Sequence, residues 1–383
     1  MTIKIFTCKR DTTACNAYRI LQPLVKLHQA GLAEVMMIEE YQLGMDKAIE
    51  GALWADILVF HRPANEDWFK FIKTMQKYGK IFVSDYDDNP FNTSPMNPFY
   101  GNIGVEEIEY MWPDGRKEWL WKDGQVSKTG KVIFNIEKNI NTRETFKLNF
   151  KKSDLVTCTT QELKDAFLKI NPNVTILPNL IDTSFFPEIP DMGKGEVRIG
   201  WQGGSSHYED LFFIKPVIKT ILEKHKNVKF VFYGDMRFQQ LFDDCVQEQI
   251  EWHHWTSHDV YPYKLTLMNM DIGLCPLVDN EFNRTKSAIK WMEYSMVNMA
   301  TIAANIPPYS SVIKHGETGL LCKEEHKDWI DALDNLIQNK GKRHAMACLA
   351  KQDVLENHNL ETKIQLWADA YEAVLHPKGT VLK

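Results

Sequence analysis

Three charged side chains in the second half of the sequence could bind a ligand that carries both phosphate and hydroxyl groups. A strand is predicted over Asp271–Cys275, and it ends at Pro276 and a polar loop. Lys286, Lys290 and Glu293 follow on a predicted helix, where their i, i+4 and i+7 spacing would place them on one face. Ammonium groups neutralise phosphate, and a carboxylate can accept two hydroxyl protons. The pattern suits a nucleotide-sugar, although a solvated helix face can show the same spacing.

A strand–glycine junction in the same half of the chain is a second candidate for phosphate binding. The strand predicted over Val197–Trp201 runs into Gly203, Gly204 and Ser205, and a helix follows. Glycines let the backbone approach a phosphate, and the N-terminus of the next helix offers free N–H groups. A Gly-Gly turn by itself is more often only a turn, so the junction gains weight from the lysines that follow it.

Length and composition favour two domains and argue against several other classes of protein. A chain of 383 residues exceeds what one hydrophobic core usually serves. The net charge of −6 argues mildly against a nucleic-acid surface, although a local basic cleft stays open. The sequence shows no signal peptide, no transmembrane run and no CxxC pair among its seven cysteines. We therefore expect a cytoplasmic protein without a metal site or integral membrane association.

Strands and helices alternate along the chain, which is typical of parallel, doubly wound α/β sheets. A stretch rich in proline and glycine, Pro187–Gly195, divides the alternation into two parts. We predict two Rossmann-like domains, residues 1–187 and 196–360, that face a cleft at their strand carboxyl ends, where open sheets bind ligands.

An aromatic insert at residues 105–130 interrupts the first domain. Asp114-Gly115 and Asp123-Gly124 are turn signals, so the insert predicts a small antiparallel β-meander. Four aromatic residues flank the turns: Tyr110, Trp112, Trp119 and Trp121. The tryptophans could stack on a sugar or a base, or they could form the small core that a meander needs. We expect a core role for most of them, with Trp119 as the candidate for acceptor binding.

Four stretches between Val197 and Cys322 resemble the donor domain of retaining glycosyltransferases with the GT-B fold, in the group 1 family, also numbered family 4. They are IGWQGGSSHYEDL, VKFVFYGD, DIGLCPLVDNEFNRTKSAIKWMEY and PPYSSVIKHGETGLLC. The close match covers about a third of the chain, and the two-domain layout extends it to the whole. The resemblance implies a nucleoside diphosphate sugar as donor, and it implies that the C-terminal segment 361–383 packs back on the first domain.

The resemblance also implies roles for individual residues. Glu293 resembles the glutamate that holds the donor ribose, and Lys286 or Lys290 the basic residue that holds the diphosphate. The loop of Gly203, Gly204 and Ser205 resembles the one that approaches the distal phosphate and the sugar. Trp255 lies in the segment that is similar to the one around the base.

One departure from the family concerns the transferred sugar. Thr285 stands where the family has the first of its two motif glutamates, which contacts that sugar. Three polar residues of the preceding loop could take over this role: Asn280, Glu281 and Asn283. The arginine of the family's basic pair has no clear counterpart either, and Arg284 and Lys286 are the candidates. The identity of the sugar is therefore left open.

Polar residues at strand ends of the first domain are candidates for binding the acceptor. His61 and Arg62 end a strand, and an acidic run with Asp87 and Asp88 ends the next one. We predict catalytic roles for His61 and Asp88, and acceptor binding by Arg19, Arg62, Asp87, Asp88 and Trp119. The alternative is a solvated loop that caps a helix, and Arg19 could equally be a surface charge.

With the resemblance, these residues predict a retaining, metal-independent hexosyltransferase that moves a sugar from a nucleoside diphosphate sugar, with UDP favoured, to an acceptor hydroxyl. The lysines would stabilise the leaving diphosphate, so no cofactor is required. The acceptor is open between a glycan, a small molecule and a hydroxymethylated base in DNA. Two alternatives are a nucleotide-sugar epimerase or hydrolase of the GT-B fold, and a sugar- or nucleic-acid-binding module with degenerate catalytic residues.

Overall fold

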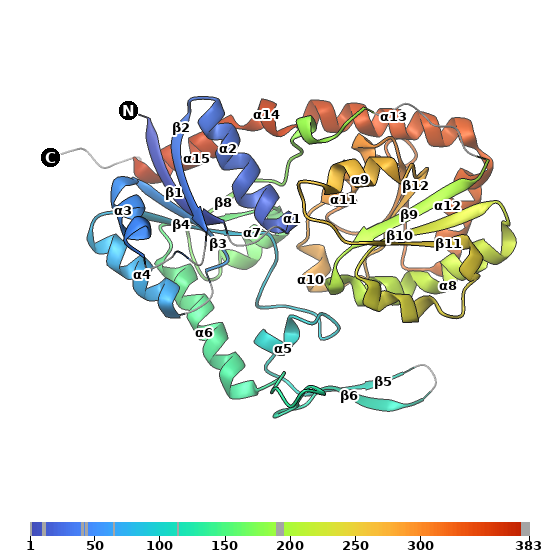
Figure 1. The fold of residues 1–383 in the computed structure, drawn as a ribbon, viewed down its shortest axis with the longest axis horizontal. Coiled ribbons are helices and arrows are strands. Elements are labelled where there is room, and N and C mark those ends of the chain that lie inside the picture. Colours follow the sequence, from blue (N-terminus) through green and yellow to red (C-terminus); the bar gives the residue numbers. More distant parts are fainter. Residues whose placement is uncertain are drawn as a thin grey trace. The chain divides into compact units, whose positions relative to one another are not determined.

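Two compact units make up the chain, and each contains one six-stranded parallel sheet with helices packed against it (Figure 1). The computed structural model describes residues 2–9, 13–39, 42, 45–63, 66–112, 115–188 and 195–376. Unit 1 contains the residues up to Pro178 and those from Glu361 on, and unit 2 spans Asn179–Leu360. Most of the linker expected at Pro187–Gly195 lies outside the described residues. The predicted α/β architecture with two Rossmann-like sheets is confirmed.

The sheet of unit 1 has the strand order β2-β1-β3-β4-β7-β8, and all neighbouring strands are parallel. Sheets of this kind are covered on both faces, which is why β3 is a run of five buried residues. The strand order reverses between β1 and β3, so the carboxyl ends there form a topological switch point. The strands are β1 (Ile3–Lys9), β2 (Ala33–Glu39), β3 (Ile57–His61), β4 (Ile81–Tyr86), β7 (Leu155–Cys158) and β8 (Val174–Ile176).

The helices of unit 1 bury one apolar face against this sheet. On α4, for example, Trp68, Ile72 and Met75 share a face and join the cluster around Phe60 and Phe82. The helical elements are α1 (Ala14–Asn16), the π-helical η1 (Ala17–Leu21), α2 (Gln22–Gln29), α3 (Asp46–Trp54), α4 (Glu66–Lys77), α5 (Tyr100–Ile103), α6 (Ile136–Lys152), α7 (Gln161–Phe167) and α15 (Gln365–Leu375), with α14 (Leu360–Lys363) at the boundary. The C-terminal helix α15 packs against α2.

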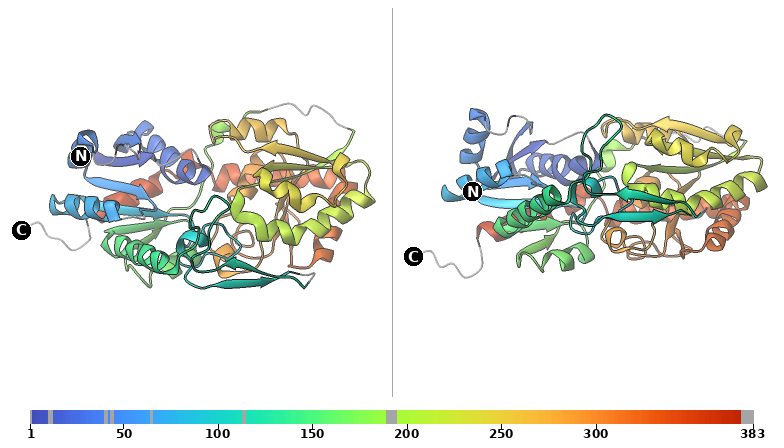
Figure 2. Two further views of the ribbon diagram at one scale, coloured as in Figure 1. Left: turned by 60° about the horizontal axis from the view of Figure 1, so that its bottom comes forward. Right: turned by 90° about the horizontal axis from the view of Figure 1, so that it is seen from below.

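The insert of unit 1 is an antiparallel hairpin of β5 (Ile108–Met111) and β6 (Lys117–Trp121). It extends away from the sheet of its own unit (Figure 2). Trp121 anchors its base, because its ring lies 5.9 Å from that of Tyr100 and its Nε1 donates to the Pro95 carbonyl at 2.6 Å. Trp119 is 40% exposed. Asp114, in one of the two predicted turns, lies outside the described residues.

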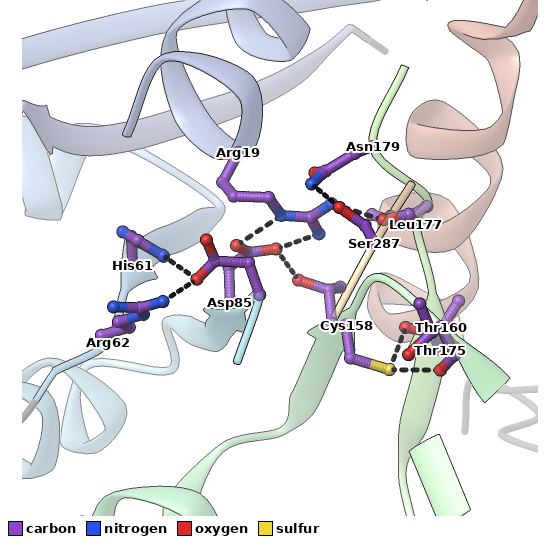
Figure 3. A network of polar contacts seen from close by, with 12 residues as sticks. Arg19, His61, Arg62, Asp85, Cys158, Thr160, Thr175, Leu177, Asn179 and Ser287 are labelled. Atoms are coloured by element: carbon purple, nitrogen blue, oxygen red, sulfur yellow. Dashed lines mark hydrogen bonds and ion pairs between the residues drawn. The ribbon is translucent and has the colours of Figure 1, made fainter. Parts of the chain in front are cut away.

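A buried ion pair ties η1 to the centre of the sheet in unit 1 (Figure 3). The Nε and Nη2 atoms of Arg19 donate to the two carboxylate oxygens of Asp85, at 2.9 and 2.6 Å. Nη1 of Arg19 donates to the Leu177 carbonyl at 2.6 Å, and Thr157 donates to Asp85 at 2.6 Å. Arg19, which the sequence suggested for acceptor binding, is therefore buried inside unit 1 and joins three of its segments.

Removing Arg19 should destabilise unit 1 strongly, because Asp85 would keep a buried charge without its counter-ion. We expect Arg19→Met to lower the free energy of unfolding by about 3–5 kcal/mol, as for other broken buried pairs. Urea unfolding followed by circular dichroism measures the loss. Arg116→Met, on an exposed hairpin residue, is the control. Equal unfolding midpoints for the two variants would show that the pair has no such role.

The sheet of unit 2 has the strand order β11-β10-β9-β12-β13-β14, again with parallel neighbours. This is the order of a dinucleotide-binding Rossmann sheet, and its switch point lies between β9 and β12. The strands are β9 (Val197–Gly203), β10 (Val228–Gly234), β11 (Ile250–His254), β12 (Ile272–Cys275), β13 (Ala300–Ala304) and β14 (Leu320–Cys322). The carboxyl ends of β9 and β12 are the edge at which a ligand site is expected.

The helical elements of unit 2 connect these strands and cover the sheet (Figure 1). They are η3 (Thr183–Phe185), η4 (Ser205–His207), α8 (Tyr208–Lys224), η5 (Met236–Phe242), η6 (Gln247–Gln249), α9 (Tyr261–Leu267), α10 (Glu281–Arg284), α11 (Ile289–Met296), α12 (His326–Gln338) and α13 (Lys340–Asn357). No helix in the described ranges is long and apolar enough to cross a membrane.

Candidate active site

The candidate site in unit 2 begins at the loop after β9, whose two glycines differ in their surroundings. A Cβ atom on Gly203 would lie 2.7 Å from the Trp201 ring and 3.1 Å from His207 Cδ2, so this glycine is required by packing. A Cβ atom on Gly204 would meet nothing within 4 Å. Only Gly204 therefore has the open side that was expected for both. Ser205 then starts the turn η4 that leads into α8.

The prediction that a single helix carries Lys286, Lys290 and Glu293 on one face is wrong. The structure has two helices, because Asn280 caps the short α10 and the chain leaves it at Thr285. Lys286 lies in the connection, and α11 starts only at residue 289. Every residue of α11 from Lys290 to Met296 is buried, so this helix has no solvated face. The charged groups of α11 are therefore interior groups that need partners.

The two lysines place positive charge inside unit 2. Lys290 is 7% exposed, and its Nζ lies 2.8 Å from His207 Nε2 and 5.4 Å from the ring centroid of Trp201. Burial, together with the charge of Lys286, lowers the pKa of Lys290 to about 8. The Nζ of Lys286 is also buried, 5.1 Å from the ring centroid of Phe282, and has no hydrogen-bond partner within the described chain. The site therefore contains a buried ammonium group, that of Lys286, without a hydrogen-bond acceptor in the described chain.

His207 and Asp210, which sequence reasoning missed, complete the surroundings of the lysines. His207 Nδ1 lies 2.7 Å from Asp210 Oδ2. Burial and the charges of Lys286 and Lys290 lower the pKa of His207 to about 3. Burial would raise the pKa of Asp210, but the hydrogen bond from His207 and the charge of Lys286 lower it. The signal was present as an i, i+3 pair at the start of a helix that follows a glycine loop.

Asp210 also holds the loop that follows β12. Its Oδ1 accepts from the Val278 N–H at 2.9 Å and from Asn283 Nδ2 at 3.0 Å. Asn283, predicted to contact the donor, is buried and donates a second hydrogen bond to the Val278 carbonyl at 2.9 Å. Thr285 is buried as well, and its hydroxyl donates to the Phe282 carbonyl at 2.8 Å. The Asn283 amide thus donates to Asp210 on α8 and to the loop carbonyl of Val278.

Glu293 lies in a second buried network at the same edge of the sheet. It is 3% exposed, and its Oε2 accepts from Gln202 Nε2 at 2.8 Å and from the Tyr261 hydroxyl at 2.9 Å. The Tyr261 ring stacks on that of Tyr233, with centroids 5.6 Å apart. These contacts hold the carboxylate in one orientation. Sequence reasoning found Glu293 but had no means of finding Gln202 and Tyr261, which lie on other elements.

Two further residues predicted to bind the donor lie at the surface of unit 2. Trp255 follows β11, is 55% exposed, and donates its backbone N–H to the Gly234 carbonyl at 3.2 Å. An indole at this strand end can stack on a base. Arg284 pairs with Asp279, with Nη2 2.6 Å from Oδ2, and is also exposed. This ion pair gives Arg284 a local role at the loop.

The polar cluster predicted in unit 1 is present at the carboxyl ends of β3 and β4. His61 Nε2 donates to Asp87 Oδ1 at 3.1 Å, and Nη2 of Arg62 donates to Asp87 and, at 2.8 Å, to Asp88. Figure 3 shows His61 and Arg62 pointing toward the same carboxylate. Burial would raise the pKa of Asp87, but Arg62 and the hydrogen bond from His61 hold it well below its usual range. Asp87 is therefore an anion that holds two side chains in place.

Comparisons with known proteins give a family match for unit 2 and solved structures of similar fold. Residues 198–339 match the family model described as glycosyl transferases group 1. HepE from Anabaena, solved with UDP and glucose, is 12% identical, with a TM-score of 0.62 over 97% of this chain and 100% of that chain. A glycosyltransferase from Rickettsia africae is 11% identical (TM-score 0.63; 98% and 99%), and sucrose-phosphate synthase from Thermosynechococcus elongatus is 10% identical (0.61; 97% and 99%). No curated protein matches the sequence.

The class of protein follows from the fold and the family match. The chain has the GT-B fold, as its solved neighbours do. Within that fold its second unit resembles the group 1 glycosyltransferases, so the part of the sequence resemblance that concerns the group 1 family is confirmed.

The pKa of Lys290 is about 8 in the folded chain, below its ordinary value of 10.5. Below pH 8 the ammonium form of Lys290 therefore destabilises the folded chain relative to the unfolded one. This cost disappears as the pH rises from 8 to 10.5. We expect Lys290→Met to raise the free energy of unfolding at pH 7 by on the order of 1 kcal/mol, less than the full pKa shift suggests because His207 loses its partner.

Thermal unfolding at pH 7 and pH 10 measures this effect. Lys327→Met removes an exposed lysine of the same unit and serves as the control. A lower melting temperature for Lys290→Met than for the control at pH 7 would show that the buried ammonium does not oppose folding.

Proposed function

We propose that this protein is a glycosyltransferase that transfers a sugar from a UDP-sugar to an acceptor hydroxyl. The observation that carries the proposal is the buried ammonium of Lys286, which has no hydrogen-bond acceptor in the described chain and lies near enough to Lys290 to lower its pKa. A diphosphate would supply the missing acceptor oxygens and neutralise both charges. The group 1 family match and the UDP complex of HepE support this choice of ligand.

The parts of a UDP-sugar fit the surrounding residues in order. The diphosphate meets Lys286 and Lys290, and the open side of Gly204 lets the backbone approach it. Glu293, oriented by Gln202 and Tyr261, accepts from the ribose hydroxyls. Trp255, exposed at the end of β11, offers its ring to the base.

The chemical task of the lysines is to stabilise the leaving group. When the bond between the anomeric carbon and the diphosphate breaks, negative charge grows on the leaving oxygen. Buried ammonium groups stabilise that charge more than exposed ones do, because water does not screen them. In our proposal this replaces the divalent cation that other transferases use, and the reaction retains the anomeric configuration, as in the retaining enzymes that the sequence resembles.

The acceptor side of the proposal rests on unit 1. His61, Arg62, Asp87 and Asp88 follow β3 and β4 at the carboxyl edge of that unit's sheet, where open sheets bind ligands. In our proposal His61 and Asp88 contact the acceptor hydroxyl, and Trp119 on the hairpin contributes an exposed ring. A glycan, a small molecule and a hydroxymethylated DNA base remain the acceptor classes to test.

Loss of either end of the donor site should weaken UDP binding. We expect Glu293→Ala and Lys286→Ala each to raise the Kd of UDP about 10- to 100-fold, because each removes charge-assisted hydrogen bonds. Glu293→Ala should act mainly on the KM of the donor, and Lys286→Ala also on kcat. Isothermal titration with UDP and turnover of UDP-glucose with a mixture of acceptors measure these effects.

The matched controls are Glu356→Ala and Lys327→Ala, two exposed residues of unit 2. If the site variants bind UDP as tightly as these controls do, the site is assigned wrongly. Release of free glucose or an epimer without any transfer would instead identify a hydrolase or an epimerase.

The affinity for UDP should fall above pH 8. The diphosphate binds the ammonium form of Lys290, whose pKa is lowered to about 8 before the ligand arrives. From pH 7 to 7.5 the Kd should be nearly constant, and from pH 8 to 9 it should rise by up to about tenfold as the free enzyme loses this proton. Titration calorimetry in two buffers of different ionisation enthalpy should show proton uptake at pH 8.5. A flat Kd up to pH 10 would contradict this assignment.

A further inference from the structure

His207 lies between a carboxylate and an ammonium group. Its Nδ1 is 2.7 Å from Asp210 Oδ2, and its Nε2 is 2.8 Å from Lys290 Nζ. An ammonium group has only donors, and a carboxylate has only acceptors. His207 Nε2 must therefore accept from Lys290, and Nδ1–H must donate to Asp210. These contacts require a neutral imidazole in the tautomer that carries its proton on Nδ1.

The chain of three groups is held on both sides. Asp210 is anchored through its other oxygen by the Val278 N–H and the Asn283 amide. The Trp201 ring lies edge-on to His207, at 6.0 Å between centroids, and also faces the Lys290 ammonium. Side chains from the start of α8, the end of β9 and α11 thus meet at one point in unit 2. The contacts with His207 and Trp201 together restrain the position of Lys290 Nζ.

We propose that His207 and Asp210 are positioning residues that hold the Lys290 ammonium in the orientation in which it binds the donor diphosphate. The inference rests on the proposed function, because it assumes the diphosphate. It adds two residues that neither the family resemblance nor the sequence pattern assigned. One N–H of Lys290 is used by His207, and its other two are directed by that bond. The ligand therefore meets an ammonium group that is already oriented.

The relay formed by Asp210, His207 and Lys290 also explains how Lys290 keeps its proton near a second cation. Burial and Lys286 both oppose the ammonium form, whereas the carboxylates of Asp210 and Glu293 favour it at longer range. The neutral ring of His207 adds an acceptor without adding a positive charge. Protonation of His207 would break this bond and place a third cation in the site. Its pKa of about 3 keeps that state away from neutral pH.

Asp210→Asn tests the relay without changing its shape. The Asn carbonyl oxygen would stay on the Val278 and Asn283 side, so its NH2 group would face His207 Nδ1 and donate to it. The ring proton would then move to Nε2, which would point a donor at the Lys290 ammonium. We expect the Kd of UDP to rise about 10- to 100-fold and the alkaline midpoint of the Kd to move to lower pH.

Two substitutions at His207 separate positioning from packing. His207→Phe keeps an aromatic ring against Trp201 but removes the acceptor, so it should reproduce the effect of Asp210→Asn. His207→Gln can place a carbonyl oxygen at the position of Nε2, so it should bind UDP within about threefold of the wild type. In the His207→Gln background, Asp210→Asn should again weaken UDP binding, because the Asn NH2 group would draw the Gln carbonyl oxygen to its own side and turn the Gln NH2 group toward Lys290.

Nitrogen-15 NMR of the imidazole ring gives a readout that needs no ligand. In the wild type at pH 7, His207 should be the neutral Nδ1–H tautomer, and in Asp210→Asn the Nε2–H tautomer. An Nε2–H tautomer in the wild type, or titration of His207 near its ordinary pKa of 6.5, would overturn the relay, independently of the result for UDP binding.

Binding distinguishes the two levels of the proposal. If Lys290→Met weakens UDP binding but His207→Phe and Asp210→Asn bind as the wild type with the same alkaline midpoint, the donor site stands and the relay is wrong. If the folded wild type does not bind UDP at millimolar concentration, the proposed function fails and the role of the relay fails with it.

Discussion

The burial of two lysine ammonium groups at the carboxyl edge of its sheet is the constraint on which unit 2 depends. Moving such a charge out of water costs several kcal/mol unless it gains partners. Lys290 gains the neutral ring of His207 and the face of Trp201, and Asp210 supplies a nearby negative charge. Lys286 has an aromatic face but no acceptor in the described chain. The unit thus keeps a local excess of positive charge, which an anionic ligand would relieve.

The rest of unit 2 is built so that these groups cannot move apart. The Tyr294 ring lies so close to β12 that a Cβ atom on Gly273 would come within 2.2 Å of it. The Tyr294 hydroxyl accepts from the backbone N–H of Gln202 at 3.1 Å, at the end of β9. Helix α11 is therefore fixed against the two strands of the switch point. Lys290 and Glu293 lie on this helix, and a close-packed interior allows little movement, so their positions relative to the two strands are fixed.

Much of the fold could be predicted from the sequence, and the errors have local causes. Strands buried on both faces are apolar runs, so the residue order of ILVFH and VKFVFY is enough to predict β3 and β10. The helix around Lys286 was predicted wrongly, because Asn280 can cap a short helix as well as stand in a loop. Arg19 shows the same limit, since an arginine on a helix can lie at a surface or, as here, pair with a carboxylate 66 residues away.

The sequence by itself determined the alternation of strands and helices, the family resemblance and three of the charged residues, because these depend on local residue order. The tertiary structure alone decided which charges are buried and which are satisfied. His207, Gln202 and Tyr261 come from segments as far as 91 residues from the lysine and glutamate they contact. Hydrogen bonds act over about 3 Å in space and leave no periodic trace in the chain. Their partners are therefore determined only when the parallel strands bring their carboxyl ends together.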